Sequence, residues 1–250
     1  MLLTVASFSL WFYNQTGRLS IVSFRLEGVL VDILKAIKLE QDFFNYETIN
    51  PQFFRQGESE YLQKHHMVLL EVKEELGELI REGRSRSIPI QKTLINQYAP
   101  RILDEVLAYE ASFQNLVILT QKRGFKDDGL EGRMRSKIHA VEDMGYGISR
   151  AEMLTLRRHE KDYIIRKDTN YGIMLENTVR ALLSKIPQDP GLSSDQKEQV
   201  ATLLKAYLTD FKQLEALESL MGTNNHRGIR GQMHKNADRM ASLMEKFFRM

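Results

Sequence analysis

The side chains best suited to chemistry in this sequence are arginines on inner helix faces and near expected helix starts. A planar guanidinium matches a carboxylate with two parallel hydrogen bonds, and a helix N-terminus adds a favourable field for an anion. Each arginine alone also fits a solvated helix surface, so we expect only some of them to line a pocket. The candidates form two groups: Arg18, Arg25, Arg227 and Arg230, and then Arg133, Arg135 and Arg150.

A second concentration of charge lies in the stretch RRHEKDYIIR at residues 157–166. Six consecutive charged or titratable positions cover more than one face of a helix, so some of them must face the protein interior. One interpretation is an ion-pair network at a junction between two packing units, and the other is direct contact with a ligand. The residues assigned to this junction are Arg157, Arg158, Glu160, Asp162 and Tyr163.

Other kinds of site find little support. The chain has no cysteine, which excludes disulfides, thiolate metal sites and thiol catalysis. Its six histidines include no H-E-x-x-H pattern, and no Ser/His/Asp order or phosphate loop is recognisable. A net charge of +2 gives no electrostatic case for nucleic acid. We therefore expect no catalytic residues, no metal and no cofactor, and we do not expect an enzyme.

The elements that must position these side chains are helices. Helix-forming residues dominate, only five prolines occur, and the period-two alternation of strands is almost absent. The sequence predicts an all-α protein with six helices. Five of them have expected ranges of about 14–50, 58–83, 129–186, 196–221 and 228–250. The third helix in chain order is expected to start between Ile90 and Pro100 and to last to about Lys122.

The expected helix over 129–186 would be the longest. It contains no proline, and its first part keeps the spacing of one buried stripe. A helix of roughly 57 residues would be about 85 Å long, which is enough to serve more than one packing unit. The stripe consists of Leu130, Met134, Ile138, Val141 and Ile148.

Two turns between helices repeat each other. The segment GLEGRMR at residues 129–135 matches GIRGQMH at residues 228–234, and each follows another glycine by a few residues. The helix lengths then favour two stacked up-and-down four-helix bundles that share two long helices. The expected membrane-distal bundle covers about residues 36–155. The membrane-proximal bundle covers about 14–35 plus 156–250.

The first thirteen residues, MLLTVASFSLWFY, carry no charge and end in three aromatic side chains. They are too few to span a bilayer, which needs about 20 residues. They fit the outer end of a truncated transmembrane helix with an interfacial aromatic belt, or an apolar turn packed in a core. The sensor region proper would then cover residues 14–250.

This arrangement, with the stretches RGFKDDGLEGRMRSKIHAVED and LRRHEKDYIIRKDTNY, resembles the helical bimodular sensor domain of bacterial chemoreceptors and sensor histidine kinases. The resemblance covers nearly the whole chain. It implies a domain between two transmembrane helices, outside the bacterial cytoplasmic membrane and in the periplasm. It also implies a homodimer. Some members of that family bind small organic acids, and others act through a periplasmic binding protein.

The expected function is therefore that of an extracytoplasmic sensor domain that binds a small organic acid anion. Binding would shift the balance between two packings of the long helices. The alternative is a helical spacer or docking module that senses through a periplasmic binding-protein partner and has no small ligand of its own. A polar, arginine-lined cavity would favour the first function, and bundles filled by Leu, Met and Phe would favour the second.

Overall fold

The computed structural model describes the backbone of residues 2–85, 89–224 and 226–249, and side chains within 21–84, 93–224 and 226–249. The described residues form helices and connecting turns and contain no strand, so the prediction of an all-α fold is confirmed. The nine α-helices of this part are α1 (Leu2–Tyr46), α2 (Pro51–Gln56), α3 (Glu60–Ser85), α4 (Pro89–Arg123), α5 (Gly129–Met144), α6 (Arg150–Arg166), α7 (Thr169–Lys185), α8 (Ser194–Met221) and α9 (Gly228–Phe248). Two short 3-10 helices, η1 (Glu47–Ile49) and η2 (Ile186–Gln188), accompany them.

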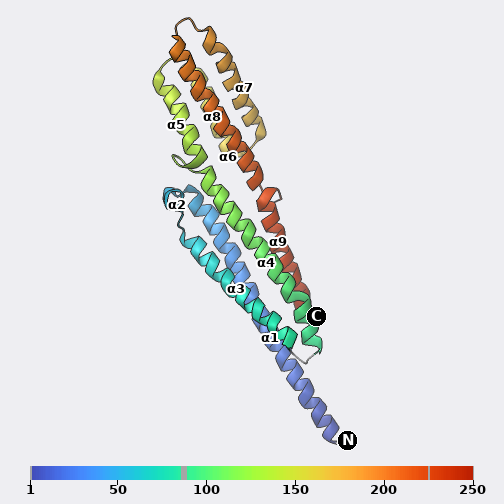
Figure 1. The fold of residues 1–250 in the computed structure, drawn as a ribbon. Coiled ribbons are helices and arrows are strands. Elements are labelled where there is room, and N and C mark those ends of the chain that lie inside the picture. Colours follow the sequence, from blue (N-terminus) through green and yellow to red (C-terminus); the bar gives the residue numbers. More distant parts are fainter. Residues whose placement is uncertain (1, 86–88, 225, 250) are drawn as a thin grey trace. The chain divides into compact units, whose positions relative to one another are not determined.

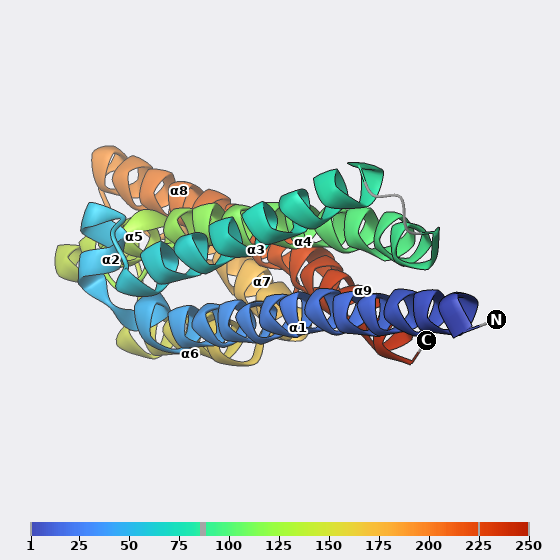
Figure 2. The same ribbon diagram turned by 90° about the horizontal axis from the view of Figure 1, so that it is seen from below.

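The chain divides into two compact units. Unit 1 holds residues 1–47, 58–115 and 231–250, and unit 2 holds residues 48–57 and 116–230. In unit 1, α1, α3, most of α4 and α9 run side by side (Figures 1 and 2). Unit 2 contains α2 and α5 to α8, with α5 against α8 and α6 against α7. These boundaries lie elsewhere than the ones near residues 35 and 155 that were expected from helix lengths.

The prediction of one helix over 129–186 is wrong, and so is the total of six helices. The first break lies between Met144 and Arg150. It contains Gly145 and Gly147, which both have left-handed φ angles (68° and 81°). Ser149 then starts α6 with a capping box, in which it bonds reciprocally with Glu152. A second break lies at Lys167, which has a φ of 54°, and Asp168, whose side chain caps α7. Local capping chemistry therefore overrides an apolar pattern that continues across both breaks.

Two other helices are the longest in the described chain. Helix α1 has 45 residues and α4 has 35. Pro89 stands at the first position of α4, where its missing N–H costs nothing, and the helix continues through Pro100. The sequence placed the start of this helix between Ile90 and Pro100. Proline in a helix interior removes one backbone hydrogen bond. Helix α4 continues through Pro100 despite this loss.

The predicted turn repeat is confirmed by backbone geometry. Gly124 and Gly129 have φ angles of 80° and 65°, and Gly222 and Gly228 have φ angles of 89° and 60°. A Cβ on Gly124 would lie 1.9 Å from the Asp128 carbonyl oxygen, and a Cβ on Gly222 would lie 1.9 Å from that of Arg227. Both turns therefore need glycine for the same two reasons, a left-handed backbone and a close approach.

Each unit has its own apolar core with one buried tyrosine–carboxylate pair. In unit 1, the Tyr109 hydroxyl donates to Glu40 over 2.6 Å. In unit 2, the Tyr207 hydroxyl donates to Glu160 over 2.8 Å. All four side chains are buried. Each phenol thus satisfies a carboxylate that would be costly to bury alone.

Of the N-terminal stretch 1–13, the structure describes residues 2–13, and only their backbone. Residues 2–13 belong to α1, but their side chains, including those of Trp11, Phe12 and Tyr13, lie outside the described residues. Among the residues that the structure describes, no helix is long and apolar enough to cross a membrane.

Candidate functional site

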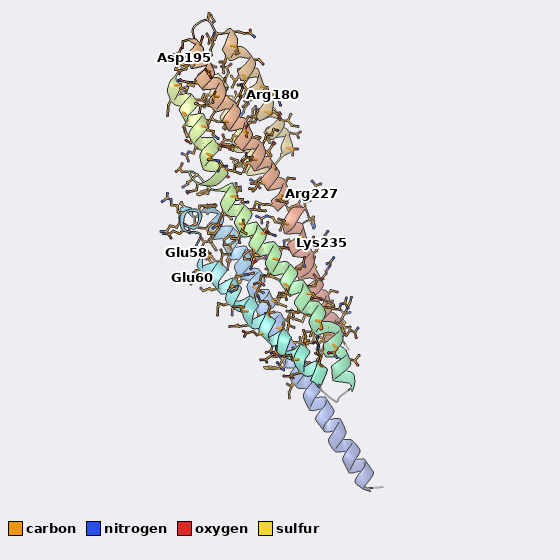
Figure 3. All side chains as sticks on the ribbon, viewed as in Figure 1. Glu58, Glu60, Arg180, Asp195, Arg227 and Lys235 are labelled. Carbon is orange, nitrogen blue, oxygen red and sulfur yellow. The ribbon has the colours of Figure 1, made fainter. Side chains whose placement is uncertain are left out.

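The candidate site is a pocket in unit 2 at the ends of α6 and α8. Its volume is about 440 Å³. This volume suits a small ligand. Lys167 and Arg227 supply positive charge, and Glu215 supplies a carboxylate. Arg227 lies in the turn between α8 and α9 (Figure 3). The remaining lining consists of Tyr163, Thr169, Ala216, Ser219, Gly222 and Thr223.

Lys167 is the most constrained residue of the pocket. It ends α6 in a left-handed conformation, with a φ of 54°, which is uncommon for a residue with a side chain. Its ammonium group forms an ion pair with Glu218. Burial lowers the pKa of Lys167, and Arg123 lowers it further, against the opposing effect of Glu218. A strained backbone that carries a partly desolvated cation is typical of functional positions.

Lys167 belongs to a network of buried ion pairs. Arg123 forms ion pairs with Glu131 and Glu218, each over 2.5 Å. Burial raises the pKa of Glu131, and Arg123 only partly offsets this effect. Glu218 is thus shared between two cations, which fixes the position of the Lys167 side chain. This network is internal to unit 2, and its charges largely cancel.

Arg227 differs from Lys167 because it has no carboxylate partner among the residues that the structure describes. Its side chain is exposed. Its backbone is held by the turn, in which its N–H donates to the Asn224 carbonyl over 3.4 Å. Arg227 therefore offers a guanidinium group that a ligand could engage without breaking an existing ion pair.

The remaining polar groups of the pocket suit hydrogen bonding to an anion. Glu215 is paired with Lys212 over 2.9 Å, which offsets its charge. Tyr163 packs edge-on against Phe211, with 5.0 Å between the ring centroids. Burial raises the pKa of Tyr163, and Glu215 adds to the effect, so the phenol stays protonated and can donate. Three further hydroxyls belong to Thr169, Ser219 and Thr223.

The structure separates the predicted arginines into the two units. Arg25 lies in unit 1 and contacts three carboxylates of α3, those of Glu75, Glu78 and Glu82. Its guanidinium is therefore already occupied. The side chain of Arg18 lies outside the described residues. The other five predicted arginines all belong to unit 2.

Of those five, only Arg227 lines the pocket. Arg133 lies 3.7 Å from Asp210, and Arg135 lies 3.6 Å from Asp127. Arg150 is the exposed first residue of α6, and Arg230 is partly buried in α9. Of the two predicted groups of arginines, this pocket thus contains one member, together with Lys167.

The charged band of residues 157–166 lies in α6, inside unit 2, so it does not mark the boundary between the units. Arg157 pairs with Glu142 over 3.0 Å and Asp162 pairs with Arg166 over 3.3 Å, as the ion-pair interpretation expects. Glu160 accepts the buried hydrogen bond from Tyr207, and Arg158 is exposed. Tyr163 belongs to the pocket wall, which is the ligand-contact interpretation for that one residue.

Two other pockets are less suited to an anion. One, in unit 1, has a volume of about 370 Å³ and is lined by three cations, but also by Asp104 and Glu105. Glu105 already pairs with Arg239 over 3.5 Å. The other pocket, in unit 2, carries Asp195 and Glu198. Within the described part of the chain, no group of three or more His, Asp or Glu side chains could hold a metal ion.

The sequence did not identify Lys167, Thr169, Glu215, Ser219 and Thr223 as pocket residues. The sequence signal for Lys167 was the residue that follows it, Asp168. An aspartate can cap the start of a new helix, and the residue before it can then end the preceding helix. Comparison with known proteins gives no further assignment: no family model, no curated protein and no solved structure matches the chain.

Proposed function

We propose that this chain is a ligand-sensing domain that binds a small organic acid anion in the unit 2 pocket. The observation that carries the proposal is that Lys167 and Arg227 line one pocket rich in hydroxyl groups, and that Arg227 has no carboxylate partner in the described part of the chain. The proposed role is binding, because the lining combines cations with hydroxyl groups that can donate hydrogen bonds to an anion.

A carboxylate is the anion that fits this lining best. Arg227 presents a planar fork that can bond both oxygens, and Lys167 adds a compact charge to the same lining. Protonated hydroxyls such as those of Tyr163 and Thr169 can donate to the same oxygens or to a substituent. The volume of about 440 Å³ accommodates a molecule of a few carbon atoms and its water.

We further propose that the domain is the extracytoplasmic part of a transmembrane receptor and that each unit is an up-and-down four-helix bundle. The two compact units, the long helices α1 and α4 and the repeated glycine turns support this architecture. A homodimer between flanking transmembrane helices belongs to the same proposal. The pocket residues come from the end of α6, the start of α7, the end of α8 and the turn that follows α8. A bound anion would draw these ends together and shift a balance between two packings.

The test is isothermal titration of the protein with acetate, succinate and citrate at low and moderate ionic strength. We expect at least one acid to bind, with an affinity that weakens as salt rises, because an exposed guanidinium is screened. Arg227→Gln should weaken that binding about tenfold or more, the equivalent of one charge-assisted hydrogen bond. Absence of binding by all three acids would count against the proposal.

One observation favours the alternative of a docking module. The core of unit 2 is filled by apolar side chains such as Met134, Leu156 and Leu214, and the pocket lies beside this core rather than within it. A domain that works through a periplasmic binding protein would need no internal cavity. Recovery of such a partner, together with no binding of the three acids, would select this alternative.

A further inference from the structure

Helices α4 and α8 carry the same residues at the same spacing. Each position of α8 lies 98 residues after its counterpart in α4. Both members of each pair of apolar residues are buried, and the glycine of each copy ends its helix. The identical pairs are Tyr109 and Tyr207, Phe113 and Phe211, Leu116 and Leu214, and Gly124 and Gly222.

Helices α1 and α6 supply the matching partners at a second constant spacing, of 120 residues. Glu40 corresponds to Glu160, and these are the two carboxylates that accept the buried tyrosine hydroxyls. One helical turn later, Phe43 corresponds to Tyr163. Phe43 meets Phe113 edge-on at 5.7 Å, as Tyr163 meets its phenylalanine at 5.0 Å.

The same four-residue contact set thus occurs once in each unit, each time between two helices, and a turn bounded by two glycines follows it. The two glycines of each turn also agree in the sign of their φ angles and in the backbone atoms that exclude a Cβ. Chance similarity of two helices would not reproduce a hydrogen bond, an aromatic contact and a turn together. The chain therefore contains an internal duplication, in which α1 and α4 correspond to α6 and α8.

The two copies differ where the pocket gains its charge. Lys167 directly follows the last residue of α6, and Glu47 directly follows the last residue of α1. The second turn is one residue longer, so the spacing rises to 99 at the glycine that ends each turn. Arg227 directly precedes the left-handed Gly228, and Asp128 directly precedes the left-handed Gly129 of the first copy. Both cations of the second copy are carboxylates in the first. The shared architecture therefore does not require positive charge at either position.

The hydrogen-bonding groups differ in the same way. Tyr163 of the pocket corresponds to Phe43, which lacks the hydroxyl, and Glu215 corresponds to Val117. Residues that the fold needs are thus kept between the copies, whereas the side chains that line the pocket, apart from Gly222, are exchanged. Selection for a ligand would produce this division.

We infer that only the second copy is adapted to an anion, so that the chain binds one anion, and that Lys167 and Arg227 determine this specificity. The inference rests on the proposed function and adds its stoichiometry and its specificity-determining residues. The comparison of the two copies also suggests test substitutions, because the first copy already has a different residue at each corresponding position. Arg227→Asp and Tyr163→Phe each place the first copy's residue in the second copy.

The experiment titrates the protein and both variants with acetate, succinate and citrate. We expect one binding site per chain for each acid that binds. Arg227→Asp should abolish measurable binding, a loss of at least about a hundredfold, since it replaces attraction by repulsion. Tyr163→Phe should weaken binding by about fivefold to tenfold, as expected for one lost hydrogen bond.

The matched control is Arg158→Asp, which makes the same charge change at an exposed position of α6 outside the pocket lining. It should leave the affinity within about twofold. Circular dichroism checks that each variant is folded, and Arg227→Gln replaces Arg227→Asp if the aspartate variant unfolds. Two sites per chain, or unchanged binding by the Arg227 variant, would overturn the inference and leave the proposed function standing. Failure of all three acids to bind the unaltered protein would remove both.

Discussion

A buried hydroxyl and the buried carboxylate that accepts its hydrogen bond depend on each other. Removing the donor leaves the carboxylate desolvated without that bond, at a cost of about 1–3 kcal/mol. We therefore expect Tyr109→Phe to lower the free energy of unfolding by this amount. Urea denaturation measures the loss. Tyr46→Phe is the control, because Tyr46 is 57% exposed and its substitution should change stability by less than about 0.5 kcal/mol.

His65 makes the stability of unit 1 depend on pH. The ring is buried 4.2 Å from the Phe113 ring, and burial lowers the pKa of His65 from 6.5 to about 4, with smaller effects of His66 and Lys73. The unfolded chain therefore binds this proton more tightly than the folded chain. The stability contribution is complete above pH 6.5 and is lost as the pH falls towards 4. At about 1.4 kcal/mol for each pH unit between the two pKa values, the loss approaches about 3 kcal/mol.

The measurement is the free energy of unfolding in urea at several pH values between 4 and 7. His65→Gln should flatten this dependence, whatever it does to stability at neutral pH. His66→Gln should leave the dependence nearly unchanged, because that side chain is 57% exposed. Equal slopes in the original protein and the His65 variant would show that the buried ring does not carry the effect.

Among single residues, chemistry and position near a helix start pointed to Arg227, which lines the pocket, and its contact with a ligand stays a prediction. Arg25 had the same chemistry, but its three glutamate partners lie on α3, far away in the sequence. Spacing within one helix cannot reveal such partners. Lys167 was missed for a related reason, because its pocket forms only where three helix ends meet.

At the level of elements, the turns set where helices stop. Gly124→Ala should destabilise the protein by about 1–3 kcal/mol or more, because alanine must adopt a left-handed φ and its Cβ would lie 1.9 Å from the Asp128 carbonyl oxygen. Gly28→Ala is the matched substitution in α1. No atom lies within 4 Å of its added Cβ, so we expect it to stabilise the helix by about 0.5–1 kcal/mol.

Thermal or urea denaturation of the two alanine variants checks these opposite signs. A Gly124 variant as stable as the original protein would show that the turn can rearrange to accept a side chain. The corresponding Gly222→Ala should behave like Gly124→Ala, because its Cβ meets the carbonyl oxygen of Arg227 at the same distance.

Helix type could be predicted for most of the described chain, but α2 lies between two expected helices and was missed, and helix limits could not be predicted. The apolar periodicity of the sequence continues from α5 through α6 into α7, although the helical backbone is interrupted twice. The signals that separate these helices are short: Gly145, Gly147 and Ser149 at one break, and Lys167-Asp168 at the other. The repeated glycine turn was recognised because two copies of it occur, and the isolated breaks had no copy for comparison.

For the whole molecule, two cores with separate buried tyrosine–carboxylate pairs imply two regions in which amide hydrogens are protected from exchange. Tyr109→Phe should reduce amide hydrogen-exchange protection chiefly within residues 58–115, and Tyr207→Phe chiefly within residues 116–230. Mass spectrometry of exchanged peptides measures this pattern. If both variants lost protection evenly along the chain, the two units would unfold as one cooperative body.

The left-handed lysine at the end of α6 also bears on how this protein would respond to selection. Glycine or asparagine would adopt the φ of 54° more readily than lysine, but neither would place an ammonium group in the pocket. A library screened only for heat resistance should therefore drift away from lysine at this position. A library screened for ligand binding should retain it, at the expense of some stability.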